Sequence, residues 1–128
     1  MLVGVPREVK DDEYRVALTP AGVMSLRQRG HKVVVETGAG AGTHISDSDY
    51  TEAGAEIASV EEVWAKAEMI VKVKEPLPEE YPLLRENQIL YTYLHLAADE
   101  RLTKALMERK IVGIAYETIQ PADGSLPL

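Results

Sequence analysis

Short apolar runs alternate with amphipathic segments along the whole chain. The runs are rich in valine, isoleucine and leucine, a composition typical of strands that are buried on both faces of a sheet. The strands predicted on this basis are Leu2–Val5, Val33–Val35, Met69–Lys74, Ile89–Leu94 and Ile111–Tyr116. Pro6 ends the first of them, because proline has no N–H to donate to a neighbouring strand.

Helices are predicted between these strands, at segments with recognisable start signals. Thr19 followed by Pro20 predicts the N-cap and first turn of a helix. Ser59 and Glu62 have the spacing of a capping box, in which each side chain binds the backbone N–H of the other residue. The predicted helices are Pro20–Gly30, Ser46–Ala53, Val60–Ala67 and Asp99–Arg109.

The alternation of strands and helices favours an α/β fold. Strand–helix–strand units of this size join parallel strands through right-handed crossovers. We therefore predict one domain over residues 1–128, a three-layer flavodoxin- or Rossmann-like domain with a mostly parallel sheet and helices on both faces. The polar tail Glu117–Leu128 ends on Leu-Pro-Leu with nothing after it to pack, which suggests a piece of a longer protein.

Composition and charge narrow the kinds of partner. The formal net charge of -7 disfavours nucleic acid and anionic membrane surfaces. The lack of cysteine excludes disulfides and thiolate metal sites, and it fits a reducing compartment. Because the amino terminus has no apolar signal core, we expect a cytoplasmic protein. The three histidines do not have metal-ligand spacing, so no metal site is expected.

Three side chains stand just beyond predicted strands: Arg15, Lys74 and His95. The carboxyl ends of parallel strands meet at one edge of a sheet, so we expect these side chains at the same edge. An arginine fork suits a carboxylate, and histidine takes up and releases a proton near neutral pH. The set is therefore expected to bind a small carboxylate and to move protons on it.

Two of these residues have simpler interpretations that the sequence leaves open. Arg15 lies among acidic residues and could form a surface ion pair with one of them. The candidate acids are Asp11, Asp12 and Glu13. Arg7, which follows Pro6 directly, competes with Arg15 for the substrate role. His95 could instead cap the helix that follows it.

The two lysines of the predicted strand Met69–Lys74 are expected to differ. Lys72 and Lys74 share one face of the strand, because side chains alternate. Lys72 lies deeper, so it must extend to solvent or lie on an exposed face. Lys74, at the strand end, can keep its ammonium in a cleft and is the functional candidate, with a solvated charge as the alternative.

The glycine-rich segment Gly38–Gly42 follows a strand, as a dinucleotide-binding loop does. It lacks the GxGxxG spacing, no long helix begins directly after it, and no acidic residue ends a second strand at the expected distance. We interpret the segment as a flexible connection. The chain also lacks the GxxxxGK[ST] and GxSxG motifs, so no nucleotide is expected to be bound here.

Five segments together resemble the amino-terminal part of alanine dehydrogenase, and they cover essentially the whole chain. They are VGVPREVKDDEYRVALTPAGV, LRQRGHKVVVETGAGAG, VKVKEPLPEEY, LYTYLHLAA and GIAYETIQPADGSLPL. The resemblance implies that Arg15 binds the substrate carboxylate and that Lys74 binds the substrate near the oxygen of the reacting carbon. It implies that His95 is the general acid/base. Tyr93, two residues before His95 on the same strand face, is expected to line the pocket.

The resemblance also implies an activity, the reversible oxidative deamination of L-alanine with NAD to pyruvate, ammonia and NADH. It implies a hexamer for the full enzyme. Transhydrogenase alpha subunits share the first segment and the arginine equivalent to Arg15. They lack the lysine equivalent to Lys74 and the histidine equivalent to His95, so these two residues favour the dehydrogenase.

The family chain continues through a separate NAD-binding Rossmann domain and returns with carboxy-terminal helices. We therefore expect this chain to be a substrate-domain fragment that is inactive alone and leaves an apolar surface exposed. A transhydrogenase-type domain, a small-carboxylate-binding module without chemistry and a purely structural domain are the alternatives.

Overall fold

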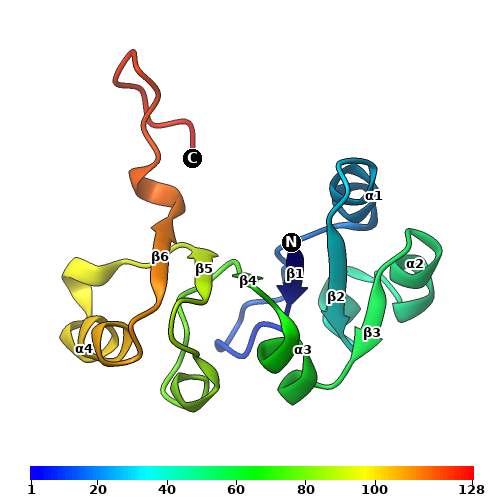
Figure 1. Ribbon diagram of the computed structural model, residues 1–128, viewed down its shortest axis with the longest axis horizontal. Coiled ribbons are helices and arrows are strands. Elements are labelled where there is room, and N and C mark those ends of the chain that lie inside the picture. The colour runs from blue at the N-terminus through cyan, green and yellow to red at the C-terminus, as the bar shows by residue number, and fades with distance from the viewer.

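Six parallel strands form one sheet in the computed structural model, which describes residues 1–128 (Figure 1). The strands are β1 (Leu2–Val5), β2 (Lys32–Glu36), β3 (Glu56–Ala58), β4 (Met69–Val71), β5 (Ile89–Thr92) and β6 (Val112–Ala115). Their order across the sheet is β3-β2-β1-β4-β5-β6, and every neighbouring pair is parallel. The first strand therefore lies inside the sheet, which extends outward on both sides of it.

Helices lie on both faces of this sheet, which confirms the predicted three-layer α/β arrangement (Figure 1). The α-helices are α1 (Pro20–Gln28), α2 (Asp47–Glu52), α3 (Val60–Lys66) and α4 (Glu100–Glu108). Short 3-10 helices span Ala41–Thr43, Tyr81–Leu83, Leu96–Ala98 and Tyr116–Thr118. On one face α1 and α2 pack over β1, β2 and β3, and on the other face α3 and α4 pack over the middle of the sheet and β5.

The alternation of side chains along β2 separates two hydrophobic cores. Val33 and Val35 face the core under α1 and α2, which also holds the fully buried Tyr50. Val34 faces the core under α3 and α4, where Trp64 is the largest buried side chain. Burial of both strand faces explains why this run is continuously apolar.

The predicted helix starts are present at the atomic level. The Thr19 hydroxyl accepts the N–H of Gly22 at 3.4 Å, and Ser59 and Glu62 form the capping box in both directions. A second capping box, between Ser46 and Asp49, opens α2. These caps satisfy N–H groups that have no partner inside the helix.

The strands of the sheet differ from the prediction at three places. Strand β3 was not predicted, because it has only three residues and lies at the sheet edge. Strands β4 and β5 end earlier than predicted, at Val71 and Thr92. Since β1 stops before Pro6, the chain beyond Val71 has no strand beside it on that side and leaves regular geometry.

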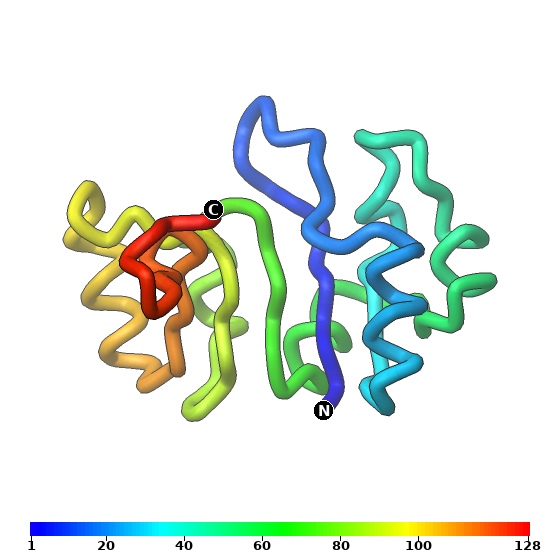
Figure 2. Tube along the Cα trace, turned by 90° about the horizontal axis from the view of Figure 1, so that it is seen from above, coloured from blue at the N-terminus to red at the C-terminus, as the bar shows by residue number.

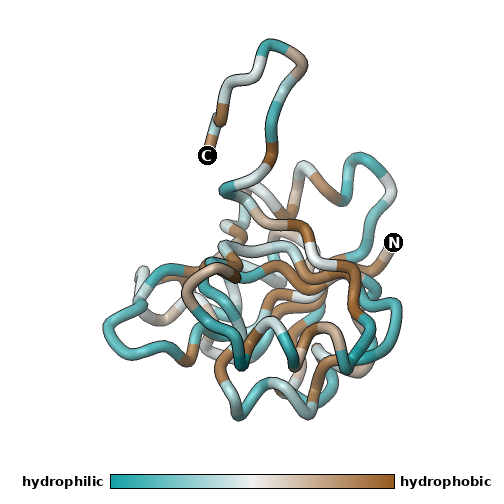
Figure 3. Tube along the Cα trace, turned by 90° about the vertical axis from the view of Figure 1, so that its left-hand side faces the viewer, coloured by the Kyte–Doolittle hydropathy of each residue, from teal (hydrophilic) through white to brown (hydrophobic).

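One face of the sheet is left partly uncovered. On the side of α1 and α2, no helix packs over β4, β5 and β6 (Figure 1). Ile114 on this face is 37% exposed, and Tyr91 and Met69 are partly exposed. Figure 3 shows the apolar strands in the middle of the molecule and the carboxy-terminal tail extending away from them.

Candidate functional site

The three strand-end residues predicted from sequence lie at one edge of the sheet. Arg15 is in the loop between β1 and α1, Lys74 follows β4, and His95 follows β5. The three strands are neighbours in the sheet and run in the same direction, so their carboxyl ends stand side by side (Figure 2). The structure brings the three residues to a common edge, where Arg15 lines one hollow and His95 lines another.

Arg15 is held by Glu13. Its Nε donates to Glu13 Oε1 at 2.7 Å and its Nη2 donates to Oε2 at 2.5 Å. The Glu13 side chain is 7% exposed and the Arg15 side chain is 60% exposed. This pair lowers the pKa of the Glu13 carboxyl to about 2, mainly through the hydrogen bond from Arg15, with a smaller contribution from the charge of Lys74. The ion pair left open by the sequence is therefore present, and it uses only one edge of the guanidinium.

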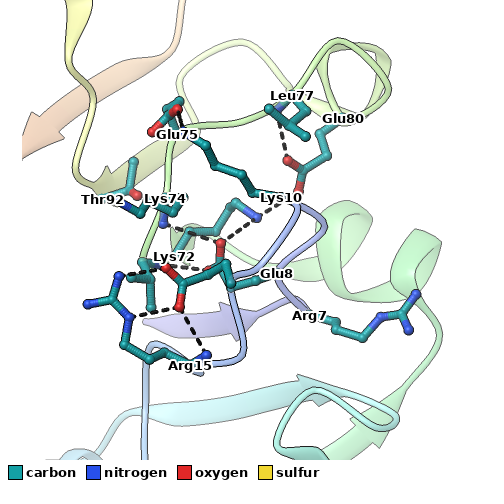
Figure 4. Close-up of polar contacts among 12 residues, drawn as sticks. Arg7, Glu8, Lys10, Arg15, Lys72, Lys74, Glu75, Leu77, Glu80 and Thr92 are labelled. Atoms are coloured by element: carbon teal, nitrogen blue, oxygen red, sulfur yellow. Dashed lines mark hydrogen bonds and ion pairs between the residues drawn. The ribbon is translucent and has the colours of Figure 1, made fainter. Parts of the chain in front are cut away.

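Arg7, the other arginine considered for the substrate role, lies beside Glu36. Its backbone N–H donates to Glu36 at the end of β2, and its side chain approaches the same carboxylate at 3.9 Å. Figure 4 shows Arg7 directed away from Arg15 and Lys74. Of the two arginines, only Arg15 lines the groove beside Tyr93.

The prediction for Lys72 is wrong. Its side chain is 1% exposed, and its ammonium lies 2.9 Å from Glu80 Oε1 and 3.4 Å from Glu8 Oε2 (Figure 4). The charge therefore does not extend to solvent, because two buried carboxylates neutralise it inside the protein. Lys74 differs: its side chain is partly exposed and its ammonium forms no ion pair or hydrogen bond.

His95 occupies a left-handed backbone conformation with φ of 49°. A carboxylate stabilises this turn, since Glu117 accepts the backbone N–H groups of His95 at 2.7 Å and of Leu94 at 3.1 Å. The imidazole does not cap the next helix, because Asp99 caps α4 and the Leu96–Ala98 turn has no side-chain cap. His95 therefore stands at the N-cap position of the Leu96–Ala98 turn but does not cap it through its side chain.

The imidazole of His95 has a carboxylate beside one nitrogen. Its Nδ1 lies 3.4 Å from Glu75 Oε2, and the other oxygen of Glu75 pairs with Lys10. When Nδ1 carries the proton, Nε2 keeps its lone pair for another partner. The ring of Tyr93 stacks on the imidazole, with ring centroids 5.9 Å apart and planes inclined by 17°.

An apolar groove of about 590 Å³ begins beside Arg15 and runs over the uncovered face. Three tyrosines form its aromatic wall. Tyr116 meets the rings of Tyr91 and Tyr93 edge-on, with centroid distances of 4.3 and 4.9 Å. Burial raises the pKa of the Tyr116 hydroxyl, so it remains a neutral donor. Tyr93 lies between this groove and His95, and its role in substrate binding stays a prediction.

Sequence reasoning missed the acidic residues that hold the site. Glu8, Glu75 and Glu117 each accept a hydrogen bond from, or lie beside, a residue at the strand ends. Glu75 could have been noticed, since it directly follows Lys74. Glu8 and Glu117 gave no such signal, because each acts on a residue distant in the sequence.

The glycine-rich segment is held in place by local hydrogen bonds. Its N–H groups are used locally: Ala39 donates to Glu36, Ala41 donates to Gly38, and Gly38 donates to Asp47 Oδ1 at 2.8 Å. A side-chain carbon at Gly40 would meet Ile45 at 2.6 Å, so the segment is closely packed rather than the flexible connection we predicted. Three of the five amides of the segment, those of Gly38, Ala39 and Ala41, are therefore unavailable to a phosphate.

The structure contains no group of three or more histidine or acidic residues placed to hold a metal ion. None of its helices has both the length and the apolar character needed to cross a membrane.

Comparisons with known proteins agree on one family. The family model described as "Alanine dehydrogenase/PNT, N-terminal domain" matches residues 4–128. The chain is 60% identical to the alanine dehydrogenase of Methanococcus maripaludis and 57% identical to that of Geobacillus stearothermophilus. Each of these alignments covers 100% of this chain and 35% of the relative. The chain therefore spans about a third of the length of these relatives.

Two solved structures show the same fold. An L-alanine dehydrogenase matches with a TM-score of 0.96 and 49% identity over 99% of this chain and 35% of its own. A transhydrogenase from Sinorhizobium meliloti matches with a TM-score of 0.88 and 29% identity over 95% of this chain and 35% of its own. The likeness is greater to the dehydrogenase in both fold and sequence.

Proposed function

The chain belongs to the alanine dehydrogenase/PNT N-terminal domain family, and from that premise we propose that it is the substrate domain of an L-alanine dehydrogenase. The reaction of the whole enzyme converts L-alanine, NAD⁺ and water into pyruvate, ammonium, NADH and a proton. One observation carries the proposal: Arg15, Lys74 and His95 stand at one sheet edge in a chain that is 60% identical to an alanine dehydrogenase along its full length.

Arg15 binds the substrate carboxylate in this proposal. Glu13 occupies the edge of the guanidinium formed by Nε and Nη2, so Nη1 stays available for a second carboxylate. Because Glu13 fixes the arginine before substrate arrives, less side-chain freedom is lost on binding. The exposure of Arg15 and its place on the rim of the groove support this role.

Lys74 and His95 act on the reacting carbon. The Lys74 ammonium, which is in no direct ion pair, stabilises negative charge on the oxygen of that carbon. His95 takes a proton from the water that adds to the oxidised, iminium form of alanine, and Nε2 accepts it while Glu75 lies beside Nδ1. In the reverse direction the same nitrogen returns the proton.

The glycine-rich segment of this chain is a poor fit for the diphosphate of NAD, since it lacks the GxGxxG spacing and the amides of Gly38, Ala39 and Ala41 are already bound within the chain. We therefore propose that NAD is bound by residues outside this chain and that the chain alone does not turn over alanine. A cytoplasmic location and a homo-oligomeric, hexameric enzyme belong to the same proposal.

A titration with pyruvate tests the proposal directly. Amide and side-chain NMR signals of Arg15, Lys74 and His95 are expected to shift together and to saturate. Arg15→Lys should weaken the titration, and the matched Arg7→Lys should leave it unchanged, because Arg7 pairs with Glu36. Absence of saturable shifts at the three residues would contradict substrate binding.

A complementation assay tests the chemistry. This chain alone, incubated with L-alanine and NAD, should show no turnover, and mixing with a separately made NAD-binding half should restore it. His95→Ala should remove most of the restored turnover without changing the fold. Turnover by the chain alone would refute the division of the site between two parts, and binding of pyruvate without restored turnover would favour a carboxylate-binding module.

A further inference from the structure

Three charged side chains form a cluster inside the protein that the proposed chemistry does not use. Glu8, Lys72 and Glu80 have side chains that are 2%, 1% and 5% exposed. The ammonium of Lys72 contacts a carboxylate on each side but makes no well-directed hydrogen bond with either. Burying such charges costs free energy even when they are paired, so the cluster calls for a reason beyond stability.

The two carboxylates hold different parts of the backbone. Glu80 accepts the N–H of Leu77 at 2.9 Å, within its own turn. Glu8 accepts the N–H of Val73 at 2.7 Å and of Lys74 at 3.2 Å, across the sheet edge. Figure 4 shows Lys72 reaching between Glu8 and Glu80, with Leu77 beyond Glu80.

Glu8 stands where a strand is missing. Strand β1 ends at Val5, and its last partner in β4 is Ile70, paired with Gly4. After Ile70, the chain of β4 has a neighbouring strand only on the side of β5. There the N–H of Lys72 donates to the carbonyl of Tyr91. The Glu8 carboxylate supplies the acceptors that β1 no longer provides, so it continues the ladder with a side chain.

We propose that Glu8 is the positioning residue for Lys74: its carboxylate clamps the N–H groups of Val73 and Lys74, and the ammonium of the buried Lys72 lies beside that carboxylate as its counter-charge. This inference rests on the proposed role of Lys74 in binding substrate. The clamp fixes the backbone that carries the Lys74 ammonium, which itself has no partner to hold it. In this proposal, Glu8 determines how far the Lys74 ammonium lies from the Arg15 guanidinium.

The charged groups around Glu8 and Arg15 are consistent with this role of Glu8. Burial raises the pKa of Glu80, which favours its neutral form and lowers the excess of negative charge in the cluster. The ammonium of Lys72 lies within reach of both carboxyl groups, 2.9 Å from Glu80 and 3.4 Å from Glu8. Arg15 is held by Glu13 instead, so the two cations of the site have separate supports.

Because Arg15 and Lys74 are held by different residues, two ligands can test them separately. Acetate has only the carboxylate that Arg15 would bind, whereas pyruvate also has the keto oxygen that Lys74 would bind. Loosening Lys74 should weaken pyruvate binding and spare acetate binding. A general loss of structure at the sheet edge would weaken both.

The test compares Glu8→Gln with Glu80→Gln in this chain. Both substitutions replace a carboxyl group beside Lys72 with an amide, but only the first acts on the clamp. For Glu8→Gln we expect hydrogen exchange at the amides of Val73 and Lys74 to become at least about tenfold faster. We expect the dissociation constant for pyruvate to rise about tenfold, and that for acetate to stay within about twofold. Glu80→Gln should leave both constants unchanged.

Unchanged exchange at Val73 and Lys74 in Glu8→Gln would overturn the clamp. Faster exchange with unchanged pyruvate binding, or an equal loss of pyruvate and acetate binding, would overturn the positioning role while leaving the proposed function intact. Failure of the unsubstituted chain to bind pyruvate would refute the proposed function and the positioning role together.

Glu8→Gln leaves Lys72 with one fewer counter-charge, so the variant could fail to fold. The double variant Glu8→Gln with Lys72→Met removes both members of that pair and is expected to fold. It should still bind pyruvate about tenfold more weakly and acetate normally. Normal pyruvate binding by the folded double variant would overturn the proposal.

Discussion

The two halves of the sheet are built differently. The half formed by β1, β2 and β3 is covered by helices on both faces, and its core side chains are almost completely buried. The half formed by β4, β5 and β6 is covered on one face only, and the other face forms the wall of an apolar groove. The candidate site lies between the two halves, since Arg15 follows β1 while Lys74 and His95 follow β4 and β5.

The two halves of the sheet differ in the side chains that they carry, according to how deeply each face is buried. The covered half uses valines, which have no polar atoms to satisfy. The uncovered face carries Tyr91, Tyr93 and Tyr116, whose rings pack against one another. Tyrosine provides an apolar ring together with a hydroxyl that accepts and donates hydrogen bonds, so it suits a surface that is neither buried nor fully exposed. The half formed by β1, β2 and β3 therefore provides stability, and the half formed by β4, β5 and β6 provides an accessible surface for a ligand.

The largest expected effect is on stability in the covered half. Tyr50 is fully buried and its hydroxyl donates to the carbonyl of Leu18 at 2.8 Å. Tyr50→Ala should lower the free energy of unfolding by about 3–5 kcal/mol, because it leaves a cavity and an unpaired carbonyl. Ile114→Ala, on the uncovered face, should cost less than about 1 kcal/mol, since the side chain is already 37% exposed. Urea denaturation of the two variants measures both values. Equal losses would show that the two halves do not differ as described.

The next effect concerns ligand binding at the boundary between the halves. Arg15→Lys keeps the positive charge but loses the planar fork, so pyruvate affinity should fall about ten- to a hundredfold. The free energy of unfolding should change by less than about 1 kcal/mol, because the Arg15 side chain is largely exposed. Isothermal calorimetry and urea denaturation separate the two quantities. A large loss of stability with little loss of affinity would make Arg15 a structural residue.

The smallest effect is a change of stability with pH at Glu13. The pKa of its carboxyl falls from an ordinary value of 4.5 to about 2 in the folded chain, so the ionised form stabilises the fold. This contribution is fully present above the ordinary pKa and is lost as the pH falls toward about 2. Glu13→Gln should therefore flatten the dependence of unfolding free energy on pH within this window.

Asp49 provides a control for that measurement. Hydrogen bonds from Ser46 lower the pKa of its carboxyl at the start of α2, away from the candidate site. Asp49→Asn should alter acid stability without changing pyruvate binding at neutral pH. If Glu13→Gln leaves the pH profile identical to that of the unsubstituted chain, the Glu13–Arg15 pair does not contribute in solution.

Much of the fold could be predicted because its signals are local. The capping residues Thr19 and Ser59 and the apolar runs determine where helices and central strands begin. Strand β3 could not be predicted in this way, since it has three residues and begins with the exposed Glu56. It is a strand because β2 offers it a free edge, which is a property of the assembled sheet.

The site was only partly predictable for the same reason. The placement of Arg15, Lys74 and His95 at one edge follows from parallel strands, a rule that needs no side-chain detail. The burial of Lys72 could not be read from its neighbours, because one of the carboxylates that neutralises it comes from a distant loop. A lysine without visible counter-charges was therefore assigned to solvent.

The Glu8 clamp has a consequence for the order in which the chain is made. The acceptor is synthesised with the first strand, yet the N–H of Val73 that it binds lies 65 positions later. At about 5–20 residues per second of translation, Glu8 stays hydrated for several seconds before its partners leave the ribosome. The clamp therefore cannot form until the residues after β4 have been made, and a nascent chain that is halted before Lys72 carries Arg15 without Lys74 or His95.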